Sequence, residues 1–255
     1  MNEYKYTKSP YTNIPEDLLN KYTMDNKIDV LNWWFDSSGD LTINTWDDAY
    51  IDKFKNAFTV QNINNNTFGW EPYPGAATNL MKAFINYNIH NMNVAVIGSL
   101  HPWIEGMLLN LNNTVTTVEY NVPIIKTNQL TAISYWDFQK TNKLYDCIVT
   151  YSSVEHSGLG RYGDPLDPDG DIKTMNDIYN NLKQDGILIW GAPVGKDALV
   201  WNAHRIYGSI RLPLMFNNFK ELEWINCDKD LFINAPLEKS RHQPVIVLQK
   251  RTILE

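Results

Sequence analysis

The stretch VAVIGSLHPWIEGMLLNLNNTVTTVEY, residues 94–120, decides the fold class of this 255-residue chain. Its apolar run from Val94 to Gly98 predicts a buried strand. The segment from Pro102 to Leu111 predicts a helix, because proline suits a first helical turn and the apolar side chains keep to one face. Thr114 to Tyr120 is rich in β-branched residues and predicts a second strand. A strand, a crossover helix and another strand are typical of a parallel α/β sheet.

The same alternation continues toward the carboxyl terminus. A helix is predicted at 172–182, and further strands are predicted at 133–138, 145–151, 187–190, 219–227 and 244–251. The last two runs are joined by residues without a strong helical pattern, which favours an antiparallel closing pair. We therefore predict one Rossmann-like α/β domain over residues 91–255, with a mostly parallel sheet and an antiparallel last strand.

Residues 1–90 differ in character, being aromatic and rich in asparagine, with helical patterns at 46–58 and 76–87. We interpret them as a helical amino-terminal extension or cap that packs on the sheet.

The composition of the chain restricts the kinds of molecule that it is expected to bind. The chain is 44% apolar with a net charge of −7, and it has no dense run of lysine and arginine. These values argue against a nucleic acid or an anionic membrane as partner, and favour a small molecule. No apolar run approaches the ~18 residues of a membrane-spanning helix, and the amino terminus has no signal-like apolar region. We expect a cytoplasmic protein with Cys147 and Cys227 as free thiols, and a homo-oligomer remains open.

The cofactor is indicated by the strand ends. Glu119 follows Gly98 by 21 residues, the separation expected of the acid that binds an adenosine ribose. The turn from Gly98 to Trp103 has one glycine and a bulky tryptophan, so it lacks the pattern that lets a backbone approach a pyrophosphate. A dinucleotide is disfavoured, whereas S-adenosylmethionine, an adenosyl ligand without phosphate, tolerates a crowded turn.

Longer motifs resemble a known family. GSLHPWIE, VEYN, SSVEHSGLGRYGDPLDPDGD, PVGKD and NAHRIYGSIRLP together resemble the family called domain of unknown function 268, from about Val94 to Pro213. LKQDGILIWGAPV resembles the helix, turn and fifth strand of class I S-adenosylmethionine-dependent methyltransferases. The resemblance implies a Rossmann-like methyltransferase fold and S-adenosylmethionine binding, and some relatives look like sugar-modifying enzymes of surface polysaccharide pathways.

The resemblance also places Asp137, at the end of the third strand, near an adenine amino group. Trp103 and Ser99 either line the methionine end or simply pack, and Asp137 is alternatively a turn or cap residue. The predicted cofactor contacts are Gly98, Ser99, Trp103, Glu119, Tyr120, Asp137, Ser152 and Ser153.

Candidate catalytic residues follow the fourth predicted strand, in the acidic, glycine-rich segment 152–171. His156 is the candidate base for a hydroxyl acceptor, because methyl transfer requires an oriented acceptor and a group that takes its proton. Glu155 would orient or charge the ring. His204, in the loop after the fifth strand, is the rival.

Candidate acceptor contacts include arginines, which suit bidentate binding of phosphate or carboxylate. The predicted set is Arg161, Tyr162, Asp164, Arg205 and Arg211. Ordinary ion pairs with nearby aspartates are the alternative for the arginines. The aspartates of segment 152–171 do not match a calcium-loop pattern, and we predict no metal.

The leading hypothesis is a methyltransferase that uses S-adenosylmethionine on a small polar or anionic acceptor, such as a hydroxyl of a sugar, sugar phosphate or nucleotide sugar. The alternatives are a Rossmann nucleotide-sugar oxidoreductase or epimerase, and a non-catalytic relative that binds a glycan or a partner protein.

Overall fold

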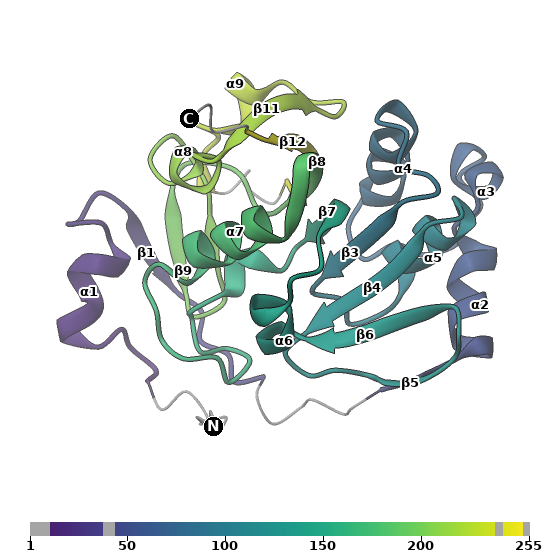
Figure 1. The fold of residues 1–255 in the computed structure, drawn as a ribbon. Helices are drawn as coiled ribbons and strands as arrows, with labels where there is room; N and C mark the ends of the chain where they lie inside the picture. Colours follow the sequence, from purple (N-terminus) through teal and green to yellow (C-terminus); the bar gives the residue numbers. More distant parts are fainter. Residues whose placement is uncertain (1–10, 38–43, 238–241, 252–255) are drawn as a thin grey trace.

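The computed structural model describes residues 11–37, 44–237 and 242–251. Its centre is a seven-stranded sheet (Figure 1). From one edge to the other, the strands are β11 (Phe219–Trp224), β12 (Ile246–Lys250), β8 (Leu182–Gly191), β7 (Tyr145–Tyr151), β3 (Asn93–Ile97), β4 (Thr114–Glu119) and β6 (Leu130–Ser134). β12 runs antiparallel to both of its neighbours, and the other pairs in the sheet are parallel. The predicted fold class is confirmed.

The strand order determines where a ligand can bind. Taken along the chain, β3, β4 and β6 extend the sheet in one direction, and β7 and β8 then extend it from β3 in the other. The chain therefore changes direction between β3 and β7. In open α/β sheets, ligands bind outside the carboxyl ends of the strands at such a point.

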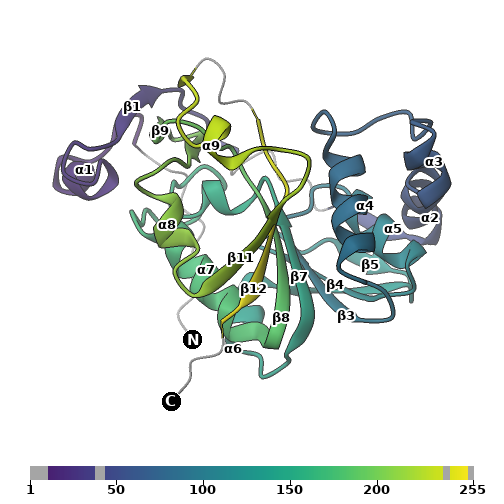
Figure 2. The ribbon, with the colours of Figure 1, turned by 90° about the horizontal axis from the view of Figure 1, so that it is seen from above.

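Helices cover both faces of the sheet, as the view from above in Figure 2 shows. One face is covered by α2 (Asp48–Ala57), α3 (Val60–Asn64), α4 (Ala76–Asn86) and α5 (Trp103–Asn110). The other face is covered by α6 (Tyr135–Lys140), α7 (Gly170–Asn181) and α8 (Leu212–Met215). Along β3, Val94 and Val96 enter the first core, whereas Ala95 and Ile97 enter the second. Burial on both faces explains the continuous apolar run of this strand.

The third predicted strand needs a correction. β6 ends at Ser134, and residues 135–140 form α6 rather than the second half of a strand. The Ser134 hydroxyl accepts a hydrogen bond from the Asp137 N–H at 3.0 Å, which caps the new helix. The aromatic residues that favoured a strand instead lie in this helix, with Tyr135 and Phe138 buried.

The amino-terminal residues join the domain in two further small sheets. β1 (Asp29–Asn32), which follows α1 (Glu16–Tyr22), pairs in parallel with β9 (Ala198–Trp201). β9 also pairs with β10 (His204–Ile206) to complete a three-stranded sheet. β2 (Thr45–Asp47) pairs with β5 (Ile124–Lys126), and α9 (Lys229–Phe232) precedes β12. The division into an extension over residues 1–90 and a second domain stays a prediction.

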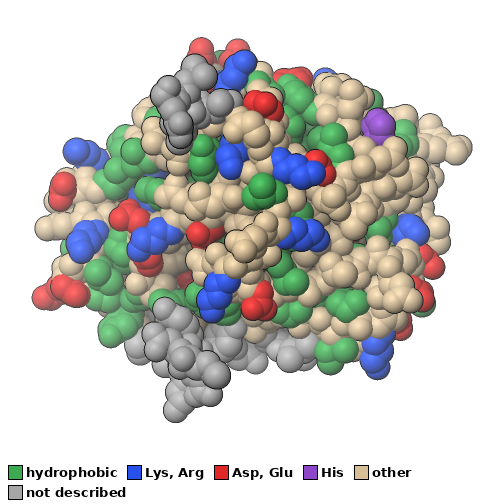
Figure 3. All heavy atoms as spheres, in the orientation of Figure 1, with side chains coloured by type: hydrophobic (Ala, Val, Ile, Leu, Met, Phe, Trp, Pro, Cys, Tyr) green, Lys and Arg blue, Asp and Glu red, His purple; other side chains and the backbone are tan. Residues whose placement is uncertain are grey.

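Acidic and basic side chains are interspersed on the face drawn in Figure 3. Within the described ranges, every helix is too short or too polar to cross a lipid bilayer.

Gly106 provides a test of the packing between α2 and α5. A Cβ atom at Gly106 would lie 2.9 Å from the backbone nitrogen of Lys55 in α2. Alanine is intrinsically the better helix former by about 1 kcal/mol, but here α2 would have to move. We expect Gly106→Ala to lower the free energy of unfolding by about 1–3 kcal/mol in urea titrations. Asn86→Ala, at an exposed position of α4, should leave it nearly unchanged. A Gly106→Ala protein as stable as the parent would contradict this account of the interface.

Candidate functional site

A cavity of about 870 Å³ lies at the carboxyl ends of β3, β4 and β7, the place that the strand order predicts. Its volume is in the range of small-molecule sites. The three-stranded sheet β1-β9-β10 contributes a further wall. The sequence-predicted residues that line it are Gly98, Ser99, Glu119, Tyr120, Ser152, Ser153, Glu155, His156, Arg161, Tyr162, Asp164 and His204.

The turn after β3 packs closely against the loop after β7. Gly98 has a φ of +82°, and a Cβ atom there would lie 2.0 Å from the Ser153 hydroxyl oxygen. Both the backbone conformation and the close approach therefore require glycine. The next residue, Ser99, donates its backbone N–H to the Glu119 carboxylate at the end of β4. The ends of three strands thus meet at the Gly98–Ser99 turn.

Two carboxyl groups lie beside this turn, Glu119 partly buried and Glu105 fully buried. Burial raises the pKa of Glu119 to about 7, and the nearby Glu105 adds to that rise. Burial also raises the pKa of Glu105, in α5, to about 7. Glu105 accepts a hydrogen bond from the Thr117 hydroxyl at 2.9 Å, and the Ser99 side chain also interacts with its carboxyl group. We did not predict Glu105 from the sequence, although a charged residue on the apolar face of a helix was a usable signal.

His156 and Glu155 lie in the short 3₁₀ helix η1 (Val154–His156). His156 Nδ1 is 2.6 Å from the carbonyl oxygen of Ala203. Because a carbonyl only accepts, we assign the proton to Nδ1, which leaves a lone pair on Nε2. Nε2 lies 3.6 Å from Glu155 Oε1, which accepts a hydrogen bond from the Ser152 hydroxyl at 2.9 Å. Burial lowers the pKa of His156 to about 3 and raises that of Glu155 to about 7.

Arg161 lies next to the two histidines. Its Nη1 donates to the same Ala203 carbonyl at 3.1 Å, and its guanidinium packs on Phe35 and Tyr162 at 4.9 and 5.0 Å from the ring centroids. Burial and the Arg161 charge together lower the pKa of His204 to about 4. Both imidazoles are therefore neutral at pH 7.

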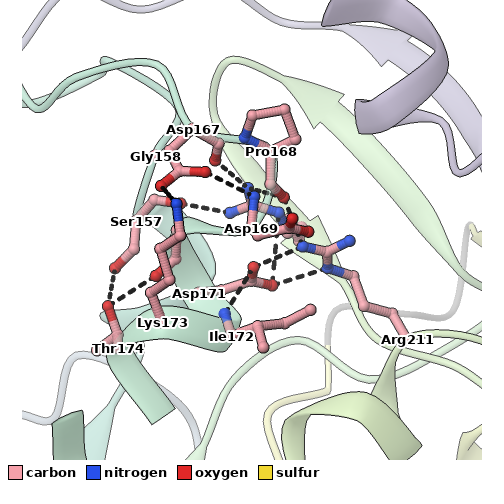
Figure 4. A network of polar contacts seen from close by, with 12 residues as sticks. Ser157, Gly158, Asp167, Pro168, Asp169, Asp171, Ile172, Lys173, Thr174 and Arg211 are labelled. Atoms are coloured by element: carbon pink, nitrogen blue, oxygen red, sulfur yellow. Dashed lines mark hydrogen bonds and ion pairs between the residues drawn. The ribbon is translucent and has the colours of Figure 1, made fainter. Parts of the chain in front are cut away.

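Arg205 and Arg211 do not line the cavity, which corrects the prediction that they bind substrate. Figure 4 shows Arg211 facing Asp171, which is wholly buried. Arg211 Nε and Nη2 donate to the Asp171 carboxylate at 2.8 and 2.6 Å. Arg205 Nε lies 3.5 Å from the same carboxylate, and Arg205 Nη1 donates to the Ser157 carbonyl at 2.6 Å. Although burial alone would raise it, the two arginines hold the pKa of Asp171 below its usual range. The ion-pair alternative describes both residues.

Asp164 lines the cavity wall, but its carboxylate is already engaged. It accepts hydrogen bonds from the backbone N–H groups of Gly158, Gly160 and Tyr162 at 2.7–3.2 Å. Asp164 therefore shapes the loop after β7 and presents Tyr162 to the cavity.

Trp103 and Asp137 also lie outside the cavity wall, which corrects their predicted cofactor contacts. Trp103 packs in the core against Phe58 and Tyr151, with ring centroids 5.9 and 6.1 Å apart. Asp137 is exposed in the first turn of α6, and its Oδ2 accepts a hydrogen bond from the Ser134 hydroxyl at 2.7 Å. Packing is the role that the sequence also allowed for Trp103, whereas the cap of α6 is Ser134 and Asp137 contacts that cap.

The sequence patterns did not identify the apolar residues of the cavity wall. Leu31 and Trp33 reach the cavity because β1 pairs with β9, and Val200 and Ile206 come from the same small sheet. No local sequence signal identifies this pairing, which joins segments about 170 residues apart.

The fold matches solved methyltransferases. The chain is similar to 1,6-didemethyltoxoflavin-N1-methyltransferase from Burkholderia thailandensis, solved with 1,6-didemethyltoxoflavin and S-adenosylhomocysteine, at 11% identity and a TM-score of 0.51, over 83% of this chain and 93% of that chain. It is also similar to N-methyltransferase NodS from Bradyrhizobium japonicum WM9 in complex with S-adenosylhomocysteine, at 10% identity, a TM-score of 0.49, and 81% and 100% coverage. A TehB-like methyltransferase from Corynebacterium glutamicum matches at 14% identity, a TM-score of 0.47, and 80% and 99% coverage. The sheet, its strand order and the first of these matches define a Rossmann-like methyltransferase fold.

A family model described as "Caenorhabditis protein of unknown function, DUF268" matches residues 91–254. The chain belongs to this family. No curated protein matches its sequence.

The buried ion pair of Asp171 can be tested against a neighbouring aspartate. Asp171→Asn leaves two buried guanidinium groups without their anion, and we expect it to lower the free energy of unfolding by about 3–5 kcal/mol. Because the folded-state pKa of Asp171 is lowered, this loss in the free energy of unfolding should be largest at neutral pH and should shrink as pH falls below about 4. Asp169→Asn, at an exposed position, is the matched control and should cost little. Equal unfolding curves for the two variants at pH 7 would refute the structural role.

Proposed function

We propose that this protein is an S-adenosylmethionine-dependent methyltransferase that acts on a small polar acceptor. The observation that carries the proposal is the carboxylate of Glu119, held at the end of β4 by the Ser99 N–H, beside the glycine turn of β3. This is where an α/β sheet of this order binds an adenosine ribose. The bound S-adenosylhomocysteine of the Burkholderia thailandensis enzyme supports the same assignment. On the family resemblance, we further propose an acceptor hydroxyl of a sugar, sugar phosphate or nucleotide sugar.

The residues present fit this cofactor. Gly98 lets the loop after β7 pack closely on the turn, and Glu119 is only partly buried and lines the cavity. A carboxylate is the acceptor that two ribose hydroxyls require.

When bound, S-adenosylmethionine supplies an electrophilic methyl group. The chain must then orient the acceptor and take its proton. His156 Nε2 carries the lone pair, and the Ala203 carbonyl holds the ring in place through Nδ1–H. Glu155, at 3.6 Å from Nε2, has a pKa of about 7 whereas that of His156 is about 3. This order of pKa values favours Glu155 as the group that finally holds the proton, whereas His156 contacts the acceptor.

The alternatives make different predictions. A nucleotide-sugar oxidoreductase or epimerase needs a nicotinamide dinucleotide, and the turn at 98–103 lacks the glycines that accommodate a pyrophosphate. A binding protein without catalysis would bind its ligand and transfer no methyl group.

The cofactor site is tested by calorimetry with S-adenosylmethionine and S-adenosylhomocysteine. We expect both to bind, and Glu119→Gln to weaken each by at least about tenfold, since a neutral amide is a poorer acceptor for two hydroxyls. Asp137→Asn removes the other predicted acidic contact, which lies outside the cavity, and should leave the affinity within about twofold. Absence of binding at millimolar ligand would sink the proposal.

The affinity for S-adenosylhomocysteine should also depend on pH. Burial raises the pKa of Glu119 to about 7, and the ionised form is the better hydrogen-bond acceptor. The affinity should therefore rise as pH increases from about 6 to 8, and the dependence should be weaker in Glu119→Gln. Parallel pH profiles for the parent and the variant would assign the dependence to another group, such as Glu105.

A further inference from the structure

The cavity has a second half that the cofactor contacts do not use. This acceptor half is walled by the loop after β7, with Glu155, His156 and Arg161, by His204 of β10, and by Trp33, which follows β1. It adjoins the turn at Gly98, so that a molecule in it would lie next to the cofactor.

Arg161 is the cationic side chain of the acceptor half. His156 and His204 are neutral at pH 7, because burial and the Arg161 charge lower their pKa values to about 3 and about 4. Burial keeps Glu155 partly protonated at pH 7, with a pKa of about 7. The carboxylate of Asp164 is occupied by three backbone N–H groups. Among the described residues that line the cavity, Arg161 is the only arginine or lysine.

Arg161 is also held in a fixed orientation. Its guanidinium packs on the rings of Phe35 and Tyr162, and its Nη1 donates to the Ala203 carbonyl. Its Nε is buried without a hydrogen-bond partner, and it forms no ion pair with any carboxylate in the part of the chain that the structure describes. A buried donor left unpaired costs free energy, which a ligand oxygen would recover. An immobilised arginine with free donors suits a phosphate or a carboxylate.

We propose that the acceptor carries an anionic group, a phosphate or a carboxylate, which Arg161 binds while a neighbouring hydroxyl or amine of the same molecule faces His156. This inference rests on the proposed methyltransferase function and names its class of substrate. His156 and Arg161 are held close together because the Ala203 carbonyl oxygen accepts a hydrogen bond from His156 Nδ1–H and another from Arg161 Nη1–H. The anionic group and the reacting atom therefore lie close together in the acceptor.

Two simple anions serve as probes. Inorganic phosphate and acetate are titrated into the protein with and without saturating S-adenosylhomocysteine, at an ionic strength kept constant with chloride, and followed by tryptophan fluorescence. We expect saturable binding of at least one anion with half-saturation below about 10 mM. The preferred anion then distinguishes a phosphorylated from a carboxylated acceptor. Absence of saturation by either anion would overturn the inference.

Variants assign the binding to Arg161. Arg161→Gln should weaken anion binding at least about tenfold, and Arg161→Lys, which keeps the charge but not Nε, should weaken it less. Lys220→Gln removes a positive charge from an exposed position on β11 and should change the affinity less than about twofold. Equal losses in Arg161→Gln and Lys220→Gln would show general charge attraction and overturn the site.

A second readout tests the charge of Arg161, after a urea unfolding curve has shown that the Arg161→Gln protein is folded. Nuclear magnetic resonance titration should find the pKa of His204 raised relative to the parent, because the charge that lowers it has been removed. If S-adenosylhomocysteine binds and the anions do not, only this inference fails. If the anions bind through Arg161 and S-adenosylhomocysteine does not, the proposed function fails and the anion site stands.

Discussion

The candidate site depends on the buried carboxylate of Asp171. This side chain is fully buried, accepts two hydrogen bonds from Arg211 and one from the Tyr207 hydroxyl, and lies 3.5 Å from Arg205 Nε. The arginines also bind loop carbonyls at Ser157 and Pro168, so that one network joins the start of α7, the loop after β7 and the segment that follows β10. Charges are costly to bury, and such a network is stable only when its donors and acceptors are all paired. It holds both walls of the acceptor half in place.

A second constraint acts at the centre of the sheet. The Gly98 backbone and the Ser153 side chain are too close for any residue but glycine at position 98, which brings the loops after β3 and β7 together. The Ser99 N–H then holds the Glu119 carboxylate. A turn with one glycine therefore suffices here, because the ligand that we propose has no pyrophosphate to accommodate. The absence of further glycines therefore disfavours adenosyl ligands that carry a pyrophosphate, and it does not disfavour one without phosphate.

Much of this could be predicted from the sequence, and the failures have identifiable physical causes. The strands around Val94 and Cys147 are buried on both faces, so their apolar runs were a strong signal. Asp137 was misplaced because a serine cap, a local hydrogen bond, outweighed the strand preference of the aromatic residues that follow it. Arg205 and Arg211 could not be separated from Arg161 by residue type. What distinguishes them is burial against Asp171, a long-range contact that no local pattern contains.

The three arginines have different roles because they contact different partners. Arg205 and Arg211 share one buried aspartate, and their positive charges stabilise the loop without reaching the cavity. Arg161 instead packs on aromatic rings, which hold the guanidinium without neutralising it. Burial and the charge of Arg161 together keep the nearby imidazoles neutral, and a neutral imidazole is the form that accepts a proton. An anionic acceptor bound at Arg161 would offset that charge and raise the basicity of His156 when the substrate is in place. In the proposed reaction, the group that selects the acceptor therefore also prepares the base that deprotonates it.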